Sequence, residues 1–287
     1  MTVKDFKEMI HRVLFCAGAN LTALTPEYEN VYLEVSKGKL VMAAWNILPF
    51  YRLGLASIDA EAEYSGNSAF FMKASFLWEF ARSEKSIPLK FRGFSTLDEL
   101  TFIREKRSHE AKPLWFSGAG NGNVYLNIGS SRLLIKRDAF HYYRNYEFTQ
   151  LCYYPESFTE IFPVSFSVNR LSLLEALRMV SAIVSPQFSC MLYLELFPGR
   201  VVLRAFDFDD SAETEIPCDY SGEETRLTFE VKLFSEIIEH IESERIDIRF
   251  CLRDVDTAIL PVYSPKPAKL QHDYFFILTQ RIKWRET

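Results

Sequence analysis

The feature that most constrains the fold of this 287-residue chain is an internal repeat. Residues 1–162 and residues 163–287 each show the same order of a helix, a hairpin, further strands, a second helix and closing strands, about 160 residues apart. The strongest local match aligns Ile87-Pro-Leu-Lys-Phe91 with Ile246-Asp-Ile-Arg-Phe250. The repeat predicts two tandem α+β domains, each with two helices packed on antiparallel sheets. Chance similarity of two unrelated α+β halves is the alternative.

Apolar residues that recur at intervals of three and four predict the helices. The four expected helices span residues 5–17, 74–85, 169–184 and 231–243. Lys37-Gly38 and Pro198-Gly199 each separate two strand-like runs, which predicts a hairpin in each half. Residues 95–112 are charged and show no clean period, so we expect a loop or an insertion there.

Composition excludes several classes of protein. The formal net charge is -5, with +1 in residues 1–162 and -6 in residues 163–287, so any contact with DNA must be local, weak or geometric rather than driven by total charge. The five cysteines are scattered without CxxC spacing, which favours reduced thiols over zinc ligands. The charged N-terminus does not resemble a signal peptide, and nowhere do 18 apolar residues run together. We therefore expect a cytoplasmic protein without a membrane partner.

No catalytic constellation stands out. The five histidines lack HxH, HxxxH and HExxH spacing, and residues 118–123 lack the Lys-Ser/Thr of a phosphate-binding loop. Asp207, Asp209 and Asp210 form the only acidic cluster that resembles a metal site, but the glycine of a calcium loop is missing. A solvated turn explains them better. The sequence predicts no enzyme, no metal and no cofactor, with a metal-dependent α+β hydrolase as the weaker alternative.

The second half resembles the C-terminal domain of the bacterial sliding clamp, the β subunit of DNA polymerase III. The similar stretches are residues 169–180, 212–216, Tyr220-Ser-Gly-Glu223, Thr228-Phe-Glu-Val231 with the following helix, and residues 274–281. No single motif is diagnostic, and the order and spacing of many weak matches carry the resemblance.

The first half is similar to the middle domain of the same family. Ala44-Trp-Asn46 and Tyr51-Arg-Leu53 stand where the family has Ala-Thr-Asp-Gly-His-Arg-Leu, with three residues inserted. Tyr146-Glu-Phe148 and Pro155 stand where it has Gly-Arg-Phe-Pro and a later proline. Two departures put a standard replication role in doubt. We expect the N-terminal domain of the family to have no counterpart here, and Leu278-Thr-Gln-Arg281 replaces its Met-Pro-Met-Arg.

The resemblance implies a scaffold that encircles duplex DNA and tethers polymerase or repair proteins. Rings of this kind contain six such domains, so two per chain would require a trimer. The helices would face DNA phosphates with these residues: Lys4, Lys7, His11, Arg12, Lys73, Arg82, Lys85, Arg170 and Arg178. The fourth helix instead carries Glu236, Glu239, Glu242 and Glu244, which would repel phosphates. An ordinary solvated helix face is the alternative for each of these charges.

The resemblance also implies a pocket for a short apolar peptide of a partner protein. Carried over by position, its residues are Arg52, Leu53, Pro155, Phe276, Leu278, Thr279, Gln280 and Arg281. Leu53, Phe276 and Leu278 could equally be core residues. The aromatic residues between 142 and 158 suggest a packing seam between the domains, or else a stacking platform for single-stranded nucleic acid. The competing interpretation of the whole chain is a clamp-derived interaction module or regulator that does not encircle DNA.

Overall fold

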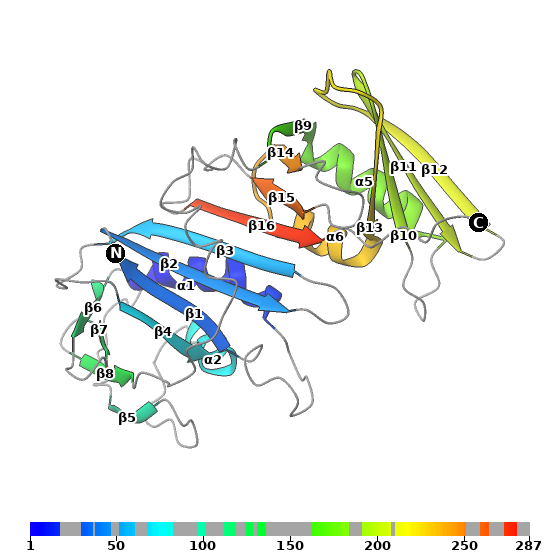
Figure 1. The fold of residues 1–287 in the computed structure, drawn as a ribbon. Helices are drawn as coiled ribbons and strands as arrows, with labels where there is room; N and C mark the ends of the chain where they lie inside the picture. The colour runs from blue at the N-terminus through cyan, green and yellow to red at the C-terminus, as the bar shows by residue number, and fades with distance from the viewer. Residues whose placement is uncertain are drawn as a thin grey trace. The chain divides into compact units, whose positions relative to one another are not determined.

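The structure is a computed structural model that places two compact units in the chain (Figure 1). The first unit comprises Met1–Asn46, Leu53–Pro155 and Ala268–Tyr274, and the second comprises Ile47–Arg52, Glu156–Pro267 and Phe275–Thr287. The domain boundary proposed at residue 162 lies near the main break between the units, and the separate folding of the two halves stays a prediction. The structure describes residues 1–17, 30–36, 38–46, 52–60, 68–82, 97–101, 112–118, 124–128, 131–135, 162–183, 191–207, 210–250, 259–263 and 273–279.

In the first unit, two helices accompany two antiparallel sheets. The helical segments are α1 (Val3–Val13), the 3-10 turn η1 (Leu14–Cys16) and α2 (Ala74–Arg82). The strands are β1 (Asn30–Ser36), β2 (Lys39–Asn46), β3 (Arg52–Asp59), β4 (Ser68–Lys73), β5 (Leu97–Thr101), β6 (Leu114–Gly118), β7 (Val124–Ile128) and β8 (Ser131–Ile135). The strand orders are β4-β1-β2-β3 and β5-β8-β7-β6.

The second unit has the same kind of content. Its helices are α5 (Arg170–Ser181) and α6 (Val231–Glu239). The strands are β9 (Val164–Asn169), β10 (Met191–Phe197), β11 (Arg200–Asp207), β12 (Asp210–Pro217), β13 (Thr225–Glu230), β14 (Arg245–Phe250), β15 (Ile259–Tyr263) and β16 (Asp273–Thr279). The strand orders are β12-β11-β10-β13 and β16-β15-β14-β9.

The two units repeat one topology. The order β4-β1-β2-β3 in the first unit corresponds to the order β13-β10-β11-β12 in the second. In both sheets the fourth strand in sequence stands at one edge, followed by the first, second and third. In each of these sheets, the strand that comes last in the sequence is followed directly by a helix. Helix α2 follows β4, and α6 follows β13. The fold class predicted from the sequence, two α+β repeats with helices on antiparallel sheets, is confirmed.

Backbone hydrogen bonds locate the equivalent positions in the second sheet of each unit. The N–H of Val3, the first residue of α1, donates to the carbonyl of Lys112 at 3.0 Å, just before β6. The N–H of Arg170, the first residue of α5, donates to the carbonyl of Glu244 at 2.8 Å, just before β14. Strand β6 is therefore the counterpart of β14, and by their order β7 matches β15 and β8 matches β16.

This equivalence corrects the local alignment of the repeat. The similarity of residues 87–91 to 246–250 pointed to a strand that lies outside the described residues, whereas the topological partner of β14 is β6. The first unit has the long segment 83–113 between α2 and β6, where the second unit has only residues 240–244. That segment contains β5 at Leu97–Thr101, so the expected loop or insertion carries a strand.

Side-chain caps begin helices α1, α5 and α6. The Oγ1 of Thr2 accepts from the Asp5 N–H at 3.2 Å, and the Asp5 carboxylate accepts from the Thr2 N–H at 2.8 Å, which forms a capping box. Asn169 Oδ1 accepts from the Ser172 N–H at 3.1 Å, as expected for an N-cap. Each cap satisfies backbone N–H groups that a helix start leaves unpaired, and so holds the helix ends in register with the strands.

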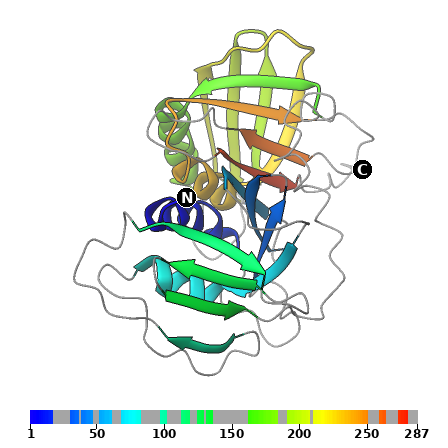
Figure 2. The same ribbon diagram turned by 90° about the vertical axis from the view of Figure 1, so that its left-hand side faces the viewer.

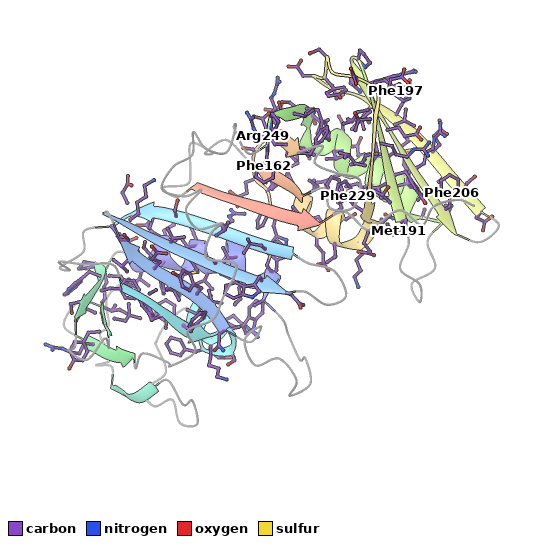
Figure 3. The ribbon with its side chains drawn as sticks, in the orientation of Figure 1. Phe162, Met191, Phe197, Phe206, Phe229 and Arg249 are labelled. Atoms are coloured by element: carbon purple, nitrogen blue, oxygen red, sulfur yellow. The ribbon has the colours of Figure 1, made fainter. Side chains whose placement is uncertain are left out.

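Aromatic side chains build much of the core. In the first unit Phe6 of α1 lies 5.5 Å from Phe80 of α2 and 6.0 Å from Phe116 of β6, measured between ring centroids. In the second unit the rings of Phe229 and Phe234 stack at 5.6 Å, and Phe229 is labelled in Figure 3. Figure 2 shows α5 and α6 side by side against the sheet β10–β13. The helices thus bury an apolar face against the sheets.

No helix in the described part of the chain is long and apolar enough to cross a bilayer.

Candidate functional site

Helix α1 presents the most basic face among the helices that the structure describes. Lys4 and His11 are exposed, and Lys7 and Arg12 are half-buried. The Lys4 Nζ lies 3.8 Å from the Glu8 carboxylate one turn on, a surface pair that contributes little to stability. Because the buried stripe of α1 runs through Phe6, Met9 and Ile10, the positive groups gather on the opposite side. This face can contact phosphates.

The second predicted helix contributes less charge than expected. Arg82 is exposed, and its guanidinium carbon lies 5.7 Å from the centroid of the Trp78 ring. Lys73 is not on α2 but is the last residue of β4, where it pairs with Asn30 in the β1–β4 ladder. It is half-buried. Lys85 lies outside the described residues.

Helix α5 is less basic still. Arg178 is exposed, and Arg170 at the first helical position is half-buried. The same exposed side carries two large apolar side chains, Leu171 at 57% and Met179 at 61% exposure. A face made for phosphates alone would not need them, so α5 has a mixed apolar and charged surface.

Helix α6 and the turn after it form an acidic surface. Glu239, Glu242 and Glu244 are exposed and Glu236 is half-buried, against a single exposed cation in this stretch, Lys232. The acidic pattern seen in the sequence is therefore on the outside of the second unit. Like charges near a phosphate backbone raise the free energy of binding, so this surface opposes DNA unless cations or a partner cover it.

The residue that begins α6 is a partly buried carboxylate. Glu230 accepts a hydrogen bond from the Leu233 N–H at 2.6 Å and caps the helix. Burial raises the pKa of the Glu230 carboxyl above its ordinary value, and the N–H groups of Leu233 and Lys232 partly oppose this. This cap was not identified from the sequence, because glutamate is not among the common N-cap residues.

The predicted peptide pocket draws on both units, and each residue can be placed only within its own unit. Leu53 in β3 is 1% exposed, and Phe276 in β16 is fully buried. For Arg52, Leu278 and Thr279 the structure describes the backbone, in β3 and β16. Pro155, Gln280 and Arg281 lie outside the described residues. Burial is what the core alternative requires for Leu53 and Phe276, and the pocket stays a prediction.

The acidic cluster after β11 gains no support as a metal site. Asp207 pairs with Asp210 at the end of the β11–β12 ladder, and Asp209 lies outside the described residues. Within the described ranges, no group of three or more His, Cys, Asp or Glu side chains could hold a metal ion. Phe206, labelled in Figure 3, is 52% exposed next to this turn.

A surface hollow that the sequence did not reveal lies in the second unit. Its volume is about 540 Å³, and it is lined by residues 167–169, 217–219, 244 and 245. Two of its lining residues form an ion pair, in which the Arg245 guanidinium donates to the Asp219 carboxylate at 2.7 Å. Burial, with the neighbouring Asp219 charge, raises the pKa of the Cys218 thiol to about 11. The thiol is therefore protonated at neutral pH and a poor nucleophile.

The structure explains why a tyrosine and a glycine occur together in Tyr220-Ser-Gly-Glu223, one of the stretches that supported the family resemblance. The buried Tyr220 donates its hydroxyl to the Glu223 carbonyl at 2.6 Å and covers Gly222. A Cβ at Gly222 would lie 2.6 Å from that hydroxyl oxygen. Only glycine fits beneath the ring, so the packing of Tyr220 requires the glycine in this stretch.

Comparison of the sequence with known proteins finds no matching family model and no matching curated protein. Comparison of the structure finds bacterial sliding clamps. The DNA polymerase III subunit β of Pseudomonas aeruginosa matches with a TM-score of 0.70 at 14% identity, over 98% of this chain and 65% of that one. The β subunit of Thermotoga maritima matches with a TM-score of 0.68 at 17% identity, over 98% of this chain and 64% of that one.

The DNA polymerase sliding clamp of Caulobacter crescentus gives a third match, with a TM-score of 0.66 at 16% identity, over 98% of this chain and 64% of that one. The chain thus spans slightly less than two thirds of the length of these proteins. The resemblance inferred from the sequence is confirmed at the level of structure. This chain has the fold of the bacterial DNA polymerase III β sliding clamps over almost its full length.

Proposed function

We propose that this protein is a non-catalytic, clamp-like scaffold that associates with duplex DNA and tethers partner proteins. The likeness of nearly the whole chain to sliding clamps carries the proposal. A clamp holds DNA by topology and mild electrostatics rather than by reading bases, so a modest basic face is sufficient. The exposed Lys4 and His11 of α1 and the exposed Arg82 of α2 supply such a face.

Ring closure would follow from the count of repeats. If a ring needs six units and each chain supplies two, three copies close it. The native mass of the protein, alone and with DNA, tests this directly. A species of three copies supports the ring, and a single copy at every concentration and on DNA argues against it.

Encirclement of DNA can be distinguished from ordinary binding by comparing circular with linear DNA. Protein loaded on a nicked circular plasmid should stay bound, and cutting the plasmid to a linear form should release it. Release from both forms at the same rate would show ordinary groove or backbone binding instead. A linear fragment blocked at both ends is the control, because it restores retention only for a topological link.

Partner capture would use the pocket transferred from the clamp family. Leu278→Asp should abolish binding of a clamp-docking peptide, because a carboxylate in an apolar groove would be desolvated without a partner. Leu278→Met, which keeps the apolar character, is the matched control. Unchanged peptide binding by the aspartate variant would refute the pocket assignment.

A second candidate is an interaction module or regulator that does not encircle DNA. The acidic surface of α6, with Glu239, Glu242 and Glu244 exposed, favours it, because these charges oppose a phosphate backbone. The enzyme alternative requires a metal-dependent activity that Asp209→Ala abolishes. We expect no such activity.

A further inference from the structure

Strand β8 occupies a position in the first unit that matters for any assembly by strand pairing. It is the topological counterpart of β16, the last strand of the repeat. One side of β8 pairs with β7, from Ile128↔Ser131 to Val124↔Ile135. Its other side is the edge at which a further strand could add, because unpaired N–H and C=O groups there can pair with another chain.

In this chain the edge of β8 is already taken by β5. The register joins Leu97 to Ile135, Leu100 to Leu133 and Thr101 to Arg132. Strand β5 comes from segment 83–113, which has no counterpart of similar length in the second unit. It is therefore an addition to the repeated fold, not a part of it.

Strand β5 has features of an edge strand that resists pairing with a further strand. It is five residues long, and its pairing shifts between Leu97 and Leu100, where Asp98 and Glu99 stand opposite one residue of β8. A short strand, a bulge and adjacent charges are the features by which edge strands resist further pairing. Among the described strands, the sheet ends at β5.

Strand β8 carries a different charge from β5, the strand that pairs with its edge. Arg132 of β8 is exposed and lies with its guanidinium carbon 5.1 Å from the Tyr125 ring centroid. In the second unit, β12 ends the order of its sheet and exposes Asp210, Glu213 and Glu215. The acids of β12, two of which also pair with Arg200 and Arg204 of β11, complement the charge of Arg132 in β8, whereas the sequence of β5 contains two further acids, Asp98 and Glu99.

We infer that the edge of β8 is a self-association site for the β12 strand of a second copy, and that β5 occupies this site within the chain. Pairing of β8 in one copy with β12 in the next is a head-to-tail contact, the kind that builds rings or open chains. Because β5 is tethered to its own β8, it competes well against a second copy at ordinary concentrations. Association therefore requires that β5 be displaced.

Two variants move β5 in opposite directions. Leu100→Pro removes an N–H and a favourable strand conformation, so β5 should leave β8. Leu97→Cys with Ile135→Cys places two thiols at a register pair, leaves Arg132 in place, and should lock β5 when oxidised. Light scattering after size exclusion should show a dissociation constant about tenfold or more lower for Leu100→Pro than for the unaltered protein. The oxidised pair should remain a single copy.

Controls separate loss of β5 from loss of the fold. Leu100→Val keeps an apolar β-former, and the reduced double-cysteine protein keeps β5 free to leave, so both should associate like the unaltered protein. In the Leu100→Pro protein, amide exchange should rise in β8 while β7 stays protected. Adding Glu213→Lys and Glu215→Lys should reverse the association, which identifies β12. Equal masses for the Leu100→Pro, unaltered and oxidised proteins would overturn the inference.

The inference rests on the proposed function only where it concerns ring closure, and its failure can be told apart. Association of the Leu100→Pro protein without retention on circular DNA would leave the β8 site standing and remove the encircling role. Retention of the oxidised, locked protein on circular DNA would support the encircling role and remove the β8 site.

Discussion

Gly222 shows how one missing side chain shapes a loop. The Tyr220 ring lies over it, and a Cβ there would meet the hydroxyl oxygen at 2.6 Å and the Cζ at 2.7 Å. We expect Gly222→Ala to lower the free energy of unfolding by about 1 to 3 kcal/mol, the range for overpacking a filled site. Thermal or urea unfolding measures the change.

The neighbouring Ser221→Ala is the matched control, because Ser221 is exposed and should tolerate the change. Tyr220→Phe should not rescue Gly222→Ala, since the ring carbons still lie within 2.9 Å of the new methyl group. Rescue by phenylalanine would show that only the hydroxyl clashes.

Glu230 links the stability of the second unit to pH. Its pKa in the folded state is raised above the ordinary 4.5, mainly by burial, so the folded protein holds this proton more tightly than the unfolded chain. The contribution of Glu230 to stability is therefore fully present below pH 4.5 and is lost as the pH rises through its folded pKa. Glu230→Gln, which does not titrate, should gain stability relative to the unaltered protein as the pH rises from 4.5 to neutrality.

Unfolding titrations across that pH range check the slope. Glu230→Ala should show the same trend with pH, but displaced by about 1 kcal/mol at every pH because the helix cap is also lost. A constant difference between the glutamine variant and the unaltered protein would contradict the assignment.

At the scale of elements, the charge on α6 predicts the direction of a designed gain in DNA binding. Replacing Glu239 and Glu242 by lysine would turn the acidic surface basic. If the helices face DNA, this double variant should bind duplex DNA about tenfold or more tightly at low salt, with a steeper salt dependence. Fluorescence anisotropy with a labelled duplex measures both.

The same charge change on a strand provides the control. Glu213→Lys with Glu215→Lys alters two exposed acids of β12, whose present partners are Arg204 at 2.9 Å and Arg200 at 3.1 Å. These surface pairs contribute little to stability. Equal gains from the helix and strand variants would mean that net charge alone governs binding and that the helices have no special role.

The elements also show where sequence patterns succeed. The stripe Phe6, Met9, Ile10 and Val13 marks α1, and the glycines at positive φ, Gly38 and Gly199, mark the two hairpin turns. Strand β5 was missed because its Leu97-Asp-Glu-Leu-Thr101 sequence neither alternates nor forms an apolar run. It exists through pairing with β8, which no local pattern can indicate.

At the scale of the whole molecule, topology and charge predict different responses to salt. Electrostatic binding to linear DNA should be weak and should be lost at moderate salt, because the basic face is small and the net charge is -5. Protein linked around a closed circle should instead survive a salt wash that strips the linear DNA. Gel filtration of protein–plasmid complexes in rising salt measures the retained fraction.

The disulfide-locked β5 variant is the control for this experiment, since it should not close a ring. Loss of the unaltered protein from circular and linear DNA at the same salt concentration would contradict encirclement and favour the interaction module.

The sequence by itself determined the repeated helix and strand order, the α+β class, the acidic surface of α6 and the likeness to sliding clamps. The first three follow from periodicity, turn residues and charge, which are local properties of the chain. The likeness to sliding clamps came from the resemblance, through the order and spacing of many weak matches. The tertiary structure decided which strands are equivalent, that β6 rather than residues 87–91 matches β14, and that β5 covers β8. It also decided that Leu53 and Phe276 are buried. Pairing partners and burial depend on residues far apart in the chain, so only the folded structure can reveal them.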